Sequence, residues 1–330
     1  MVAWHFETAE PEKGGGGASL PRVGRFAIGW RSMTNPRRAY AFGLMTVLLW
    51  STVATAFKLT LRHLEPVQML LVAHVTSIVV LAVILWVRGN IKALGSMTKR
   101  QALTSLGLGL INPFLYYLVL FEAYHRLPAQ EAQSLNYTWA ITLSLLSVPL
   151  LKQRITARQL VAAALGYAGV VVIATRGDVL SLRFSDTFGV LLALGSTVLW
   201  SIYWIFSKRD TREPVVALLS SFLLGLPFVV GACLWLSTPW ITNVRGLLGA
   251  IYVGVFEMGA AFVLWLEALR ASEHTARVSQ LIFLSPFLSL VFIRLGLGEP
   301  IVRSTYVGLG LILMGLMVQK GAKASPEGQG

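Results

Sequence analysis

The sequence predicts an all-α integral membrane protein whose ten transmembrane helices form two inverted five-helix repeats. Three observations support this fold class. Hydrophobic residues make up 55% of the 330-residue chain and charged residues only 13%, whereas soluble domains carry about 25% charged residues. The apolar residues gather in long runs without charge, and motifs of the first half of the chain return in the second half.

Each predicted helix corresponds to a run that can cross the bilayer core, which requires roughly 20 mostly apolar residues. Nine runs contain no Asp, Glu, Lys or Arg, and one further run is interrupted only by Glu257. In chain order the runs are 39–57, 66–87, 101–121, 132–151, 159–175, 187–207, 214–244, 246–266, 278–293 and 304–319. The shorter runs reach full length where a flanking Lys or Arg side chain extends to the interface.

The repeat is visible as paired motifs. LLWSTVATAFK at 48–58 matches VLWSIYWIFSK at 198–208, and each is soon followed by Glu-Pro. Farther on, an offset of 145 residues pairs Glu122-Ala123 with Glu267-Ala268 and Asn112 with Glu257. We therefore expect repeat 1 at 39–176 and repeat 2 at 187–319. Because each repeat holds five helices, an odd number, the second must enter the membrane from the opposite side.

The charges between the runs predict the orientation. With a cytoplasmic N-terminus, 20 of the 28 Lys and Arg residues lie on the inner side, as the positive-inside rule requires. We expect a multi-pass protein of the inner (plasma) membrane with both termini in the cytoplasm. Residues 1–38 and 320–330 are read as a disordered basic tail and a second cytoplasmic tail, with Met33 as an alternative start. The net charge of +13 therefore indicates membrane topology, and no nucleic-acid partner is expected.

The repeated motifs resemble a known family. The LLWS…K opening, the Glu-Ala pairs and the GEPI turn at 298–301 are similar to the EamA domain of the drug/metabolite transporter superfamily, over roughly residues 40–320. The resemblance implies ten helices, cytoplasmic termini, a central cavity lined by both halves, and transport of small metabolites. The chain departs from the family pattern at Gln153, where members carry an acid; the second copy keeps Glu299.

Inverted repeats also predict how such a protein works. In transporters of this design the substrate site lies near mid-membrane between the repeats, and one half rocks against the other. We expect export of amino acids or related amines by alternating access, with proton coupling as an open question. The alternatives are an uncoupled facilitator and a nucleotide-sugar or phosphate-ester exchanger. An intramembrane enzyme is a remote alternative, because the chain has no His-Glu-x-x-His or Gly-x-Ser-x-Gly motif.

Glu257 is the main candidate for the site, because ionisable groups inside hydrocarbon are costly and usually functional. It follows Arg245 by 12 residues, which at 1.5 Å per residue places it about 18 Å from the membrane entry. We expect it to bind a substrate amine or to exchange a proton, and its repeat partner Asn112 to lie at matching depth. The alternative interpretation is a Glu that only hydrogen-bonds a neighbouring helix.

Aromatic and amide side chains on nearby runs complete the predicted site. They would suit a zwitterion or amine with an apolar body, although each aromatic ring could equally fill space between helices. The further substrate-binding candidates are Trp50, Tyr116, Asn136, Tyr137, Trp139, Trp200, Tyr203, Trp265, Ser279 and Gln280. No cofactor or metal is expected, since Cys233 is the single cysteine.

Other residues carry structural expectations. We expect His74 to be a neutral, hydrogen-bonded core residue, with a proton relay as the alternative. Lys58 and Lys208 should extend to the interface or attract anions to the two cavity mouths. Small residues in the fifth and tenth runs predict close helix packing, either repeat against repeat or protomer against protomer in a homodimer. These residues are Ala162, Gly166, Gly169, Gly308, Gly310 and Gly315.

Overall fold

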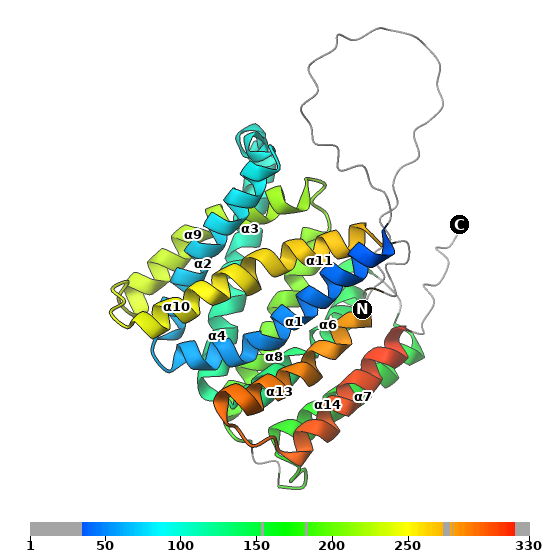
Figure 1. Ribbon diagram of the computed structural model, residues 1–330. Coiled ribbons are helices and arrows are strands. Elements are labelled where there is room, and N and C mark those ends of the chain that lie inside the picture. The colour runs from blue at the N-terminus through cyan, green and yellow to red at the C-terminus, as the bar shows by residue number, and fades with distance from the viewer. Residues whose placement is uncertain (1–34, 153–154, 182–183, 273–277, 279, 321–330) are drawn as a thin grey trace, which may run out of the picture.

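The computed structural model describes residues 35–152, 155–181, 184–272, 278 and 280–320. Nearly all of the two predicted tails therefore lies outside the described residues, as do Met33, Gln153 and Ser279. The described chain is helical (Figure 1). Nine of its helical segments are long and apolar enough to cross a membrane, and an eighteen-residue helix follows them as the tenth. The predicted all-α membrane architecture is confirmed.

The first repeat contains five spans. The third and the fourth are each built from shorter helices, and a short 3₁₀ turn, η1 (Ile91–Ser96), joins the second span to the third. The helices are α1 (Pro36–Leu61), α2 (Pro66–Val87), α3 (Lys99–Gly109) with η2 (Leu110–Leu115) and α4 (Tyr116–Arg126), α5 (Ala129–Asn136) with α6 (Trp139–Leu151), and α7 (Ala157–Ala174).

The second repeat follows the same plan. Its helices are α8 (Thr187–Ser207), α9 (Pro214–Leu236), α10 (Val244–Tyr252) with η3 (Val253–Ala260) and α11 (Ala261–Arg270), η4 (Gln280–Leu284) with α13 (Ser285–Leu297), and α14 (Arg303–Lys320). The repeated Glu-Pro motif begins α2 and α9, with proline in the first turn of each. Proline suits that position because its missing N–H would have no helical partner there.

One predicted run was too long. The charge-free run 214–244 ends as a helix at Leu236, and residues 237–243 form a loop that contains Pro239. Proline breaks a helix without adding a charge, so a search for charge-free runs did not detect this boundary.

The helices of the two repeats pack in a symmetric pattern. Helix α1 contacts α11 and α13, and its repeat partner α8 contacts α4 and α6. Two helices also pack directly against their own repeat partners: α2 contacts α9, and α7 contacts α14. In Figure 1 the α7–α14 pair forms one edge of the bundle, while α2 and α9 lie at the opposite edge. These main contacts between repeats thus occur in matching pairs, as expected for a pseudo-twofold axis.

Glycines allow the closest of these contacts. A Cβ atom on Gly169 of α7 would lie 2.4 Å from the carbonyl oxygen of Gly308, and one on Gly315 of α14 would lie 2.6 Å from that of Ala162. The offset of 146 residues that pairs Gly169 with Gly315 also pairs Ala162 with Gly308. The prediction that these helices pack repeat against repeat is confirmed.

Two spans are interrupted at matching points. In η2 the backbone of Asn112 is extended (φ −140°, ψ 120°) and Pro113 follows, while η3 is a π-helical segment that contains Glu257. Both interruptions lie midway along their spans, which run from Lys99 to Arg126 and from Val244 to Arg270. Interruptions of this kind are frequent at functional sites, and in transporters they mark the binding region.

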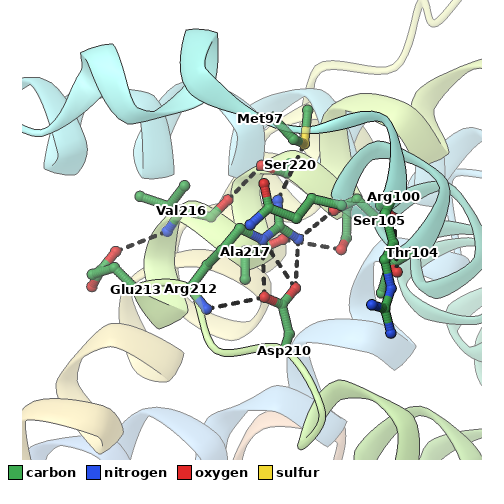
Figure 2. Close-up of polar contacts among 12 residues, drawn as sticks. Met97, Arg100, Thr104, Ser105, Asp210, Arg212, Glu213, Val216, Ala217 and Ser220 are labelled. Carbon is green, nitrogen blue, oxygen red and sulfur yellow. Dashed lines mark hydrogen bonds and ion pairs between the residues drawn. The ribbon is translucent and has the colours of Figure 1, made fainter.

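An ion pair fixes the corner between α8 and α9. Figure 2 shows Arg212 paired with Asp210 of the same corner and reaching across to helix α3. There its guanidinium donates to the hydroxyl of Ser105 at 2.6 Å, and a second nitrogen lies 3.2 Å from the sulfur of Met97. The carboxylate of Glu213 accepts from the N–H of Val216 at 2.9 Å and caps α9. The corner is therefore held to the first repeat by polar contacts.

Candidate functional site

A cavity of about 120 Å³ lies between the two repeats, near the middle of the spans. Helices α1, α4, α5, α6, α8 and α11 contribute to its wall, together with η3 and η4. Its lining residues are Trp50, Val53, Ala54, Phe57, Tyr116, Leu120, Tyr124, Gln133, Asn136, Tyr137, Trp139, Trp200, Glu257, Phe262 and Ile282.

The cavity brings together seven of the residues that the sequence singled out. Two are tryptophans from equivalent places in the repeats, Trp50 and Trp200, and one is the mid-span acid Glu257. The remaining four are Tyr116, Asn136, Tyr137 and Trp139. The seven side chains come from five spans, so the helices must be packed before these groups can meet.

Glu257 is the acidic group of this cavity. It lies at the midpoint of the 27-residue span Val244–Arg270, roughly 20 Å along the helix from either end. The hydroxyl of Tyr117 donates to one carboxyl oxygen of Glu257 at 3.3 Å. The other carboxyl oxygen is buried and has no hydrogen-bond partner among the described residues. A buried polar atom without a partner is costly, so this oxygen is available to a ligand or a proton.

The aromatic residues form a continuous wall. The ring of Trp200 stacks on that of Tyr116, with centroids 4.5 Å apart. Phe262 contacts both repeat-related tryptophans, at 6.0 Å from Trp50 and 5.9 Å from Trp200. Near the other end of the cavity, Phe57 and Tyr124 meet edge to face at 5.1 Å. Ring faces of this kind attract cations and pack against apolar bodies.

Four predicted members do not line the cavity, and a fifth, Ser279, lies outside the described residues. Gln280 is exposed and does not line the cavity. Tyr203 and Trp265 stand behind the wall, where they contact Trp200 and Trp50 at 5.7 and 5.6 Å. The side-chain amide of Asn112 is buried near Tyr203, but it makes no standard hydrogen bond with a described residue and does not reach the cavity.

Several lining residues were missed by the sequence analysis, although the spacing carried a signal. Trp50, Val53, Ala54 and Phe57 follow one another at helical spacing on α1, and the series 116, 120, 124 does so on α4. Residues three and four apart share a helix face, so extending each face from Trp50 and Tyr116 would have found them. Phe262 and the partner Tyr117 carried no such signal, because their place depends on how separate helices meet.

The structure also places the three other polar residues considered in the sequence: His74, Lys58 and Lys208. His74 is fully buried and its Nε2 lies 2.7 Å from the carbonyl oxygen of Phe222, so the hydrogen-bonded core histidine is confirmed. Lys58 is half-buried and hydrogen-bonds the backbone. Its Nζ donates to the carbonyl oxygens of Tyr124 and Leu127, at 2.8 and 2.9 Å, and so neutralises the negative C-terminal end of α4. Its repeat partner Lys208 is exposed, as expected.

The arrangement has a definite chemical character. Among the described residues, the lining contains one carboxyl group, amides from Gln133 and Asn136, and many aromatic faces, but no Lys, Arg or His. The Asn136 amide already donates to the hydroxyl of Ser196 at 3.0 Å. A ligand that carries a positive charge next to an apolar body matches these groups, whereas a phosphate would find no cation to bind.

Comparison with known proteins identifies relatives along most of the chain. The EamA-like transporter family matches it twice, over residues 37–175 and 187–319. A transporter of Archaeoglobus fulgidus is 26% identical over 281 residues, covering 83% of this chain and 95% of the relative. The aromatic amino acid exporter YddG of Ancylobacter novellus is 26% identical over 265 residues, covering 79% of this chain and 90% of the exporter.

A solved crystal structure shares the fold. It superposes with a TM-score of 0.61 and 21% sequence identity, and the match covers 85% of this chain and 96% of that one. The expected relationship to EamA-domain proteins, and with it a transporter and not an enzyme, is confirmed.

Proposed function

The chain belongs to the EamA-like transporter family, and we propose that it exports amino acids or related amines across the inner membrane by alternating access. The central cavity is the substrate site of this proposal. Glu257 binds the ammonium group, and the aromatic wall holds the apolar body. Proton exchange at the same carboxyl group would couple export to the pH gradient.

One observation carries the proposal. Glu257 is the one acid among the described residues of the cavity wall, its free carboxyl oxygen is buried at mid-span, and aromatic faces surround it. Amine recognition uses such an acid together with cation–π contacts. The relative named as an aromatic amino acid exporter supports the same class of substrate.

The size of the cavity fits a transport cycle. At about 120 Å³ it is smaller than the roughly 300–1,000 Å³ of most ligand pockets. A substrate larger than a few water molecules enters after the repeats separate on one side. The paired interruptions at η2 and η3 lie beside the cavity, where a rocking motion would need the helices to bend.

The alternative substrate class within the same superfamily is a nucleotide sugar or phosphate ester. Such ligands need Lys or Arg for their phosphates, and the lining residues that the structure describes include neither. The geometry therefore favours the amine over the phosphate ester. An uncoupled facilitator would have the same cavity, and only flux measured with and without a pH gradient distinguishes it from a proton-coupled exporter.

Flux into and out of proteoliposomes tests the proposal. Labelled amino acids, their amines and a nucleotide sugar are each loaded, with and without an imposed pH gradient. We expect saturable flux of an aromatic or branched amino acid or its amine, abolished or strongly weakened in Glu257→Gln. Saturable flux of the nucleotide sugar with no response to amino acids would overturn the proposal. A flux unaffected by the pH gradient would identify a facilitator.

The orientation is tested separately. We propose that both termini are cytoplasmic, because charge bias and repeat inversion agree on that topology. Reporter fusions at residue 181, between α7 and α8, and at residue 210, between α8 and α9, should report opposite sides, the former outside. Two reporters on the same side would contradict the inverted arrangement.

A further inference from the structure

A second cavity, which we call the vestibule, lies at the end of the bundle where α1 ends and α5 begins. It is wider than the central cavity, with a volume of about 500 Å³. Charges of both signs line it. The positive groups are Lys58, Arg126 and Arg176, and the negative groups are Glu131 and Glu299; Val302 also lines it. A volume of this size falls within the range of roughly 300–1,000 Å³ that small-molecule sites occupy.

The vestibule and the central cavity share a wall. Phe57 and Tyr124 line the central cavity, whereas the next residue on α1, Lys58, and the turn residue Leu127 line the vestibule. The two hydrogen bonds from Lys58 to the carbonyl oxygens of Tyr124 and Leu127 close this wall. A molecule that leaves the central cavity on this side therefore passes into the vestibule.

Two of the five charged groups are already occupied. The guanidinium of Arg126 pairs with Glu122 at 2.7 Å and with Asp186 at 3.7 Å. The carboxylate of Glu131 is buried, and it accepts from Arg176 Nε at 2.9 Å and from the hydroxyl of Ser185. Neither group has much capacity left for a ligand.

Three groups retain capacity. Glu299 accepts only from the N–H of Ala129, through both carboxyl oxygens at 3.2 and 3.4 Å, and it makes no ion pair within the described part of the chain. Arg176 uses Nε for Glu131, half of its side chain is exposed, and it lines the vestibule. Lys58 has donated two of its three N–H groups.

We propose that the vestibule is a second substrate site, which binds the head group of a zwitterionic amino acid. Glu299 takes the ammonium group, and Arg176, aided by the third N–H of Lys58, takes the carboxylate. This inference rests on the proposed function for the class of substrate, but it assigns that substrate a separate site with its own residues.

The charge pattern decides the class of ligand. The described lining of the central cavity offers a carboxyl group and no cation, so it distinguishes amines from acids but gives the substrate carboxylate no partner. The vestibule supplies the missing cation and repeats the anion. A molecule that carries both charges gains two charge-assisted contacts there, whereas an amine or a carboxylic acid alone gains one.

Site-specific labelling tests the proposal directly. The protein is prepared in detergent with Cys233→Ala, which removes its single, buried cysteine, and Val302→Cys, which places a thiol at the vestibule edge. Labelling by a maleimide is timed in the presence of phenylalanine, phenethylamine or 3-phenylpropionate. These probes share one apolar body and differ only in head group. If the Val302→Cys variant is too unstable to heat to be used, Ser185→Cys serves as the reporter in its place.

We expect phenylalanine to slow labelling at least fivefold, and the other two probes to need about tenfold higher concentrations, since each loses one charge-assisted contact. Glu299→Gln keeps the acceptor for Ala129 and should raise the half-protecting concentration of phenylalanine by about tenfold. Arg62→Gln removes an exposed charge from the same end of the bundle and should change nothing. Protection should persist in Glu257→Gln, because that residue lies in the other cavity.

The outcomes separate the two proposals. Amino acid flux without protection, or equal protection by all three probes, overturns the vestibule site and leaves the proposed function standing. Protection with the expected order of probes but without any amino acid flux keeps the vestibule site and overturns the proposed function. Loss of protection in Glu257→Gln shows that the reporter senses the central cavity, which also overturns the vestibule site.

Discussion

The two repeats share their helix-packing positions but differ in their polar side chains. Trp50 and Trp200 occupy matching places and meet the same ring, that of Phe262. Gly109 of the first repeat packs on the backbone of α9, and Gly254 of the second packs on that of α2. These positions hold helices at fixed distances, so both copies must keep them.

The polar positions differ. Glu257 faces the central cavity and bonds Tyr117, whereas its partner Asn112 is buried away from the cavity. Lys58 bonds two carbonyl oxygens, whereas its partner Lys208 is exposed. We infer that symmetry serves the motion of the bundle, while binding an asymmetric molecule requires the two halves to differ.

The largest expected effect on transport separates Glu257 from Asn112. Glu257→Gln keeps the shape of the side chain but loses its charge, and losing one partner of a buried charge pair costs about 2 kcal/mol or more. This predicts an apparent KM for an amine substrate about thirtyfold higher, and a transport rate that no longer responds to pH. Asn112→Ala should raise KM less and leave the pH profile unchanged. Flux measured between pH 5.5 and 8.5 checks both, and an unchanged Glu257→Gln would make that acid structural.

The second prediction tests the shared frame. A Cβ on Gly109 would lie 2.2 Å from the carbonyl oxygen of Ser221, and one on Gly254 would lie 2.5 Å from that of Ala73. Because backbone atoms cannot move aside cheaply, each glycine-to-alanine change should cost about 3 kcal/mol of unfolding free energy. The control is Gly107→Ala on the same helix as Gly109, where a Cβ meets nothing within 4 Å. Thermal unfolding in detergent measures all three, and unequal losses at 109 and 254 would contradict an equivalent frame.

A third prediction compares the two lysines. Lys58→Met leaves the carbonyl oxygens of Tyr124 and Leu127 without their donor and should cost about 2 kcal/mol of unfolding free energy. Lys208→Met changes an exposed side chain and should stay within about 0.5 kcal/mol of the parent. Chemical or thermal unfolding of the two variants gives the difference. Equal effects would mean that the hydrogen bonds of Lys58 add nothing to stability.

The smallest effect concerns the corner at Asp210 and Arg212. The hydrogen bond from Arg212 lowers the pKa of Asp210 below its ordinary value. A carboxyl group with a lowered folded-state pKa contributes stability above its unfolded pKa of about 4, and this is lost as the pH falls through the folded value. Asp210→Asn should therefore lower the melting temperature near neutral pH by about 2 to 4 °C and flatten its decline in acid. The matching corner of the first repeat packs Leu64 against Gly246 and should show no such acid dependence.

The sequence was sufficient for much of this picture. Charge-free runs located the spans because hydrocarbon excludes charged residues along whole segments, and motif spacing revealed the repeat and its inversion by parity. Glu257, Trp50 and Trp200 could be selected because an acid or a repeated tryptophan at mid-span is unusual. One helix end, at Leu236, was not predicted, because the proline that follows ends the helix without introducing a charge.

Only the tertiary structure decided which side of each helix faces inward. A membrane helix is apolar on all sides, so its sequence has little periodicity to mark the buried face. For this reason the sequence placed Gln280 and Asn112 at the site although neither lines the cavity, and Tyr117 was missed as the partner of Glu257. The vestibule is a stronger case. Its charged residues come from segments more than 200 residues apart, from Lys58 to Glu299, and only the packing of the two repeats brings them to one place.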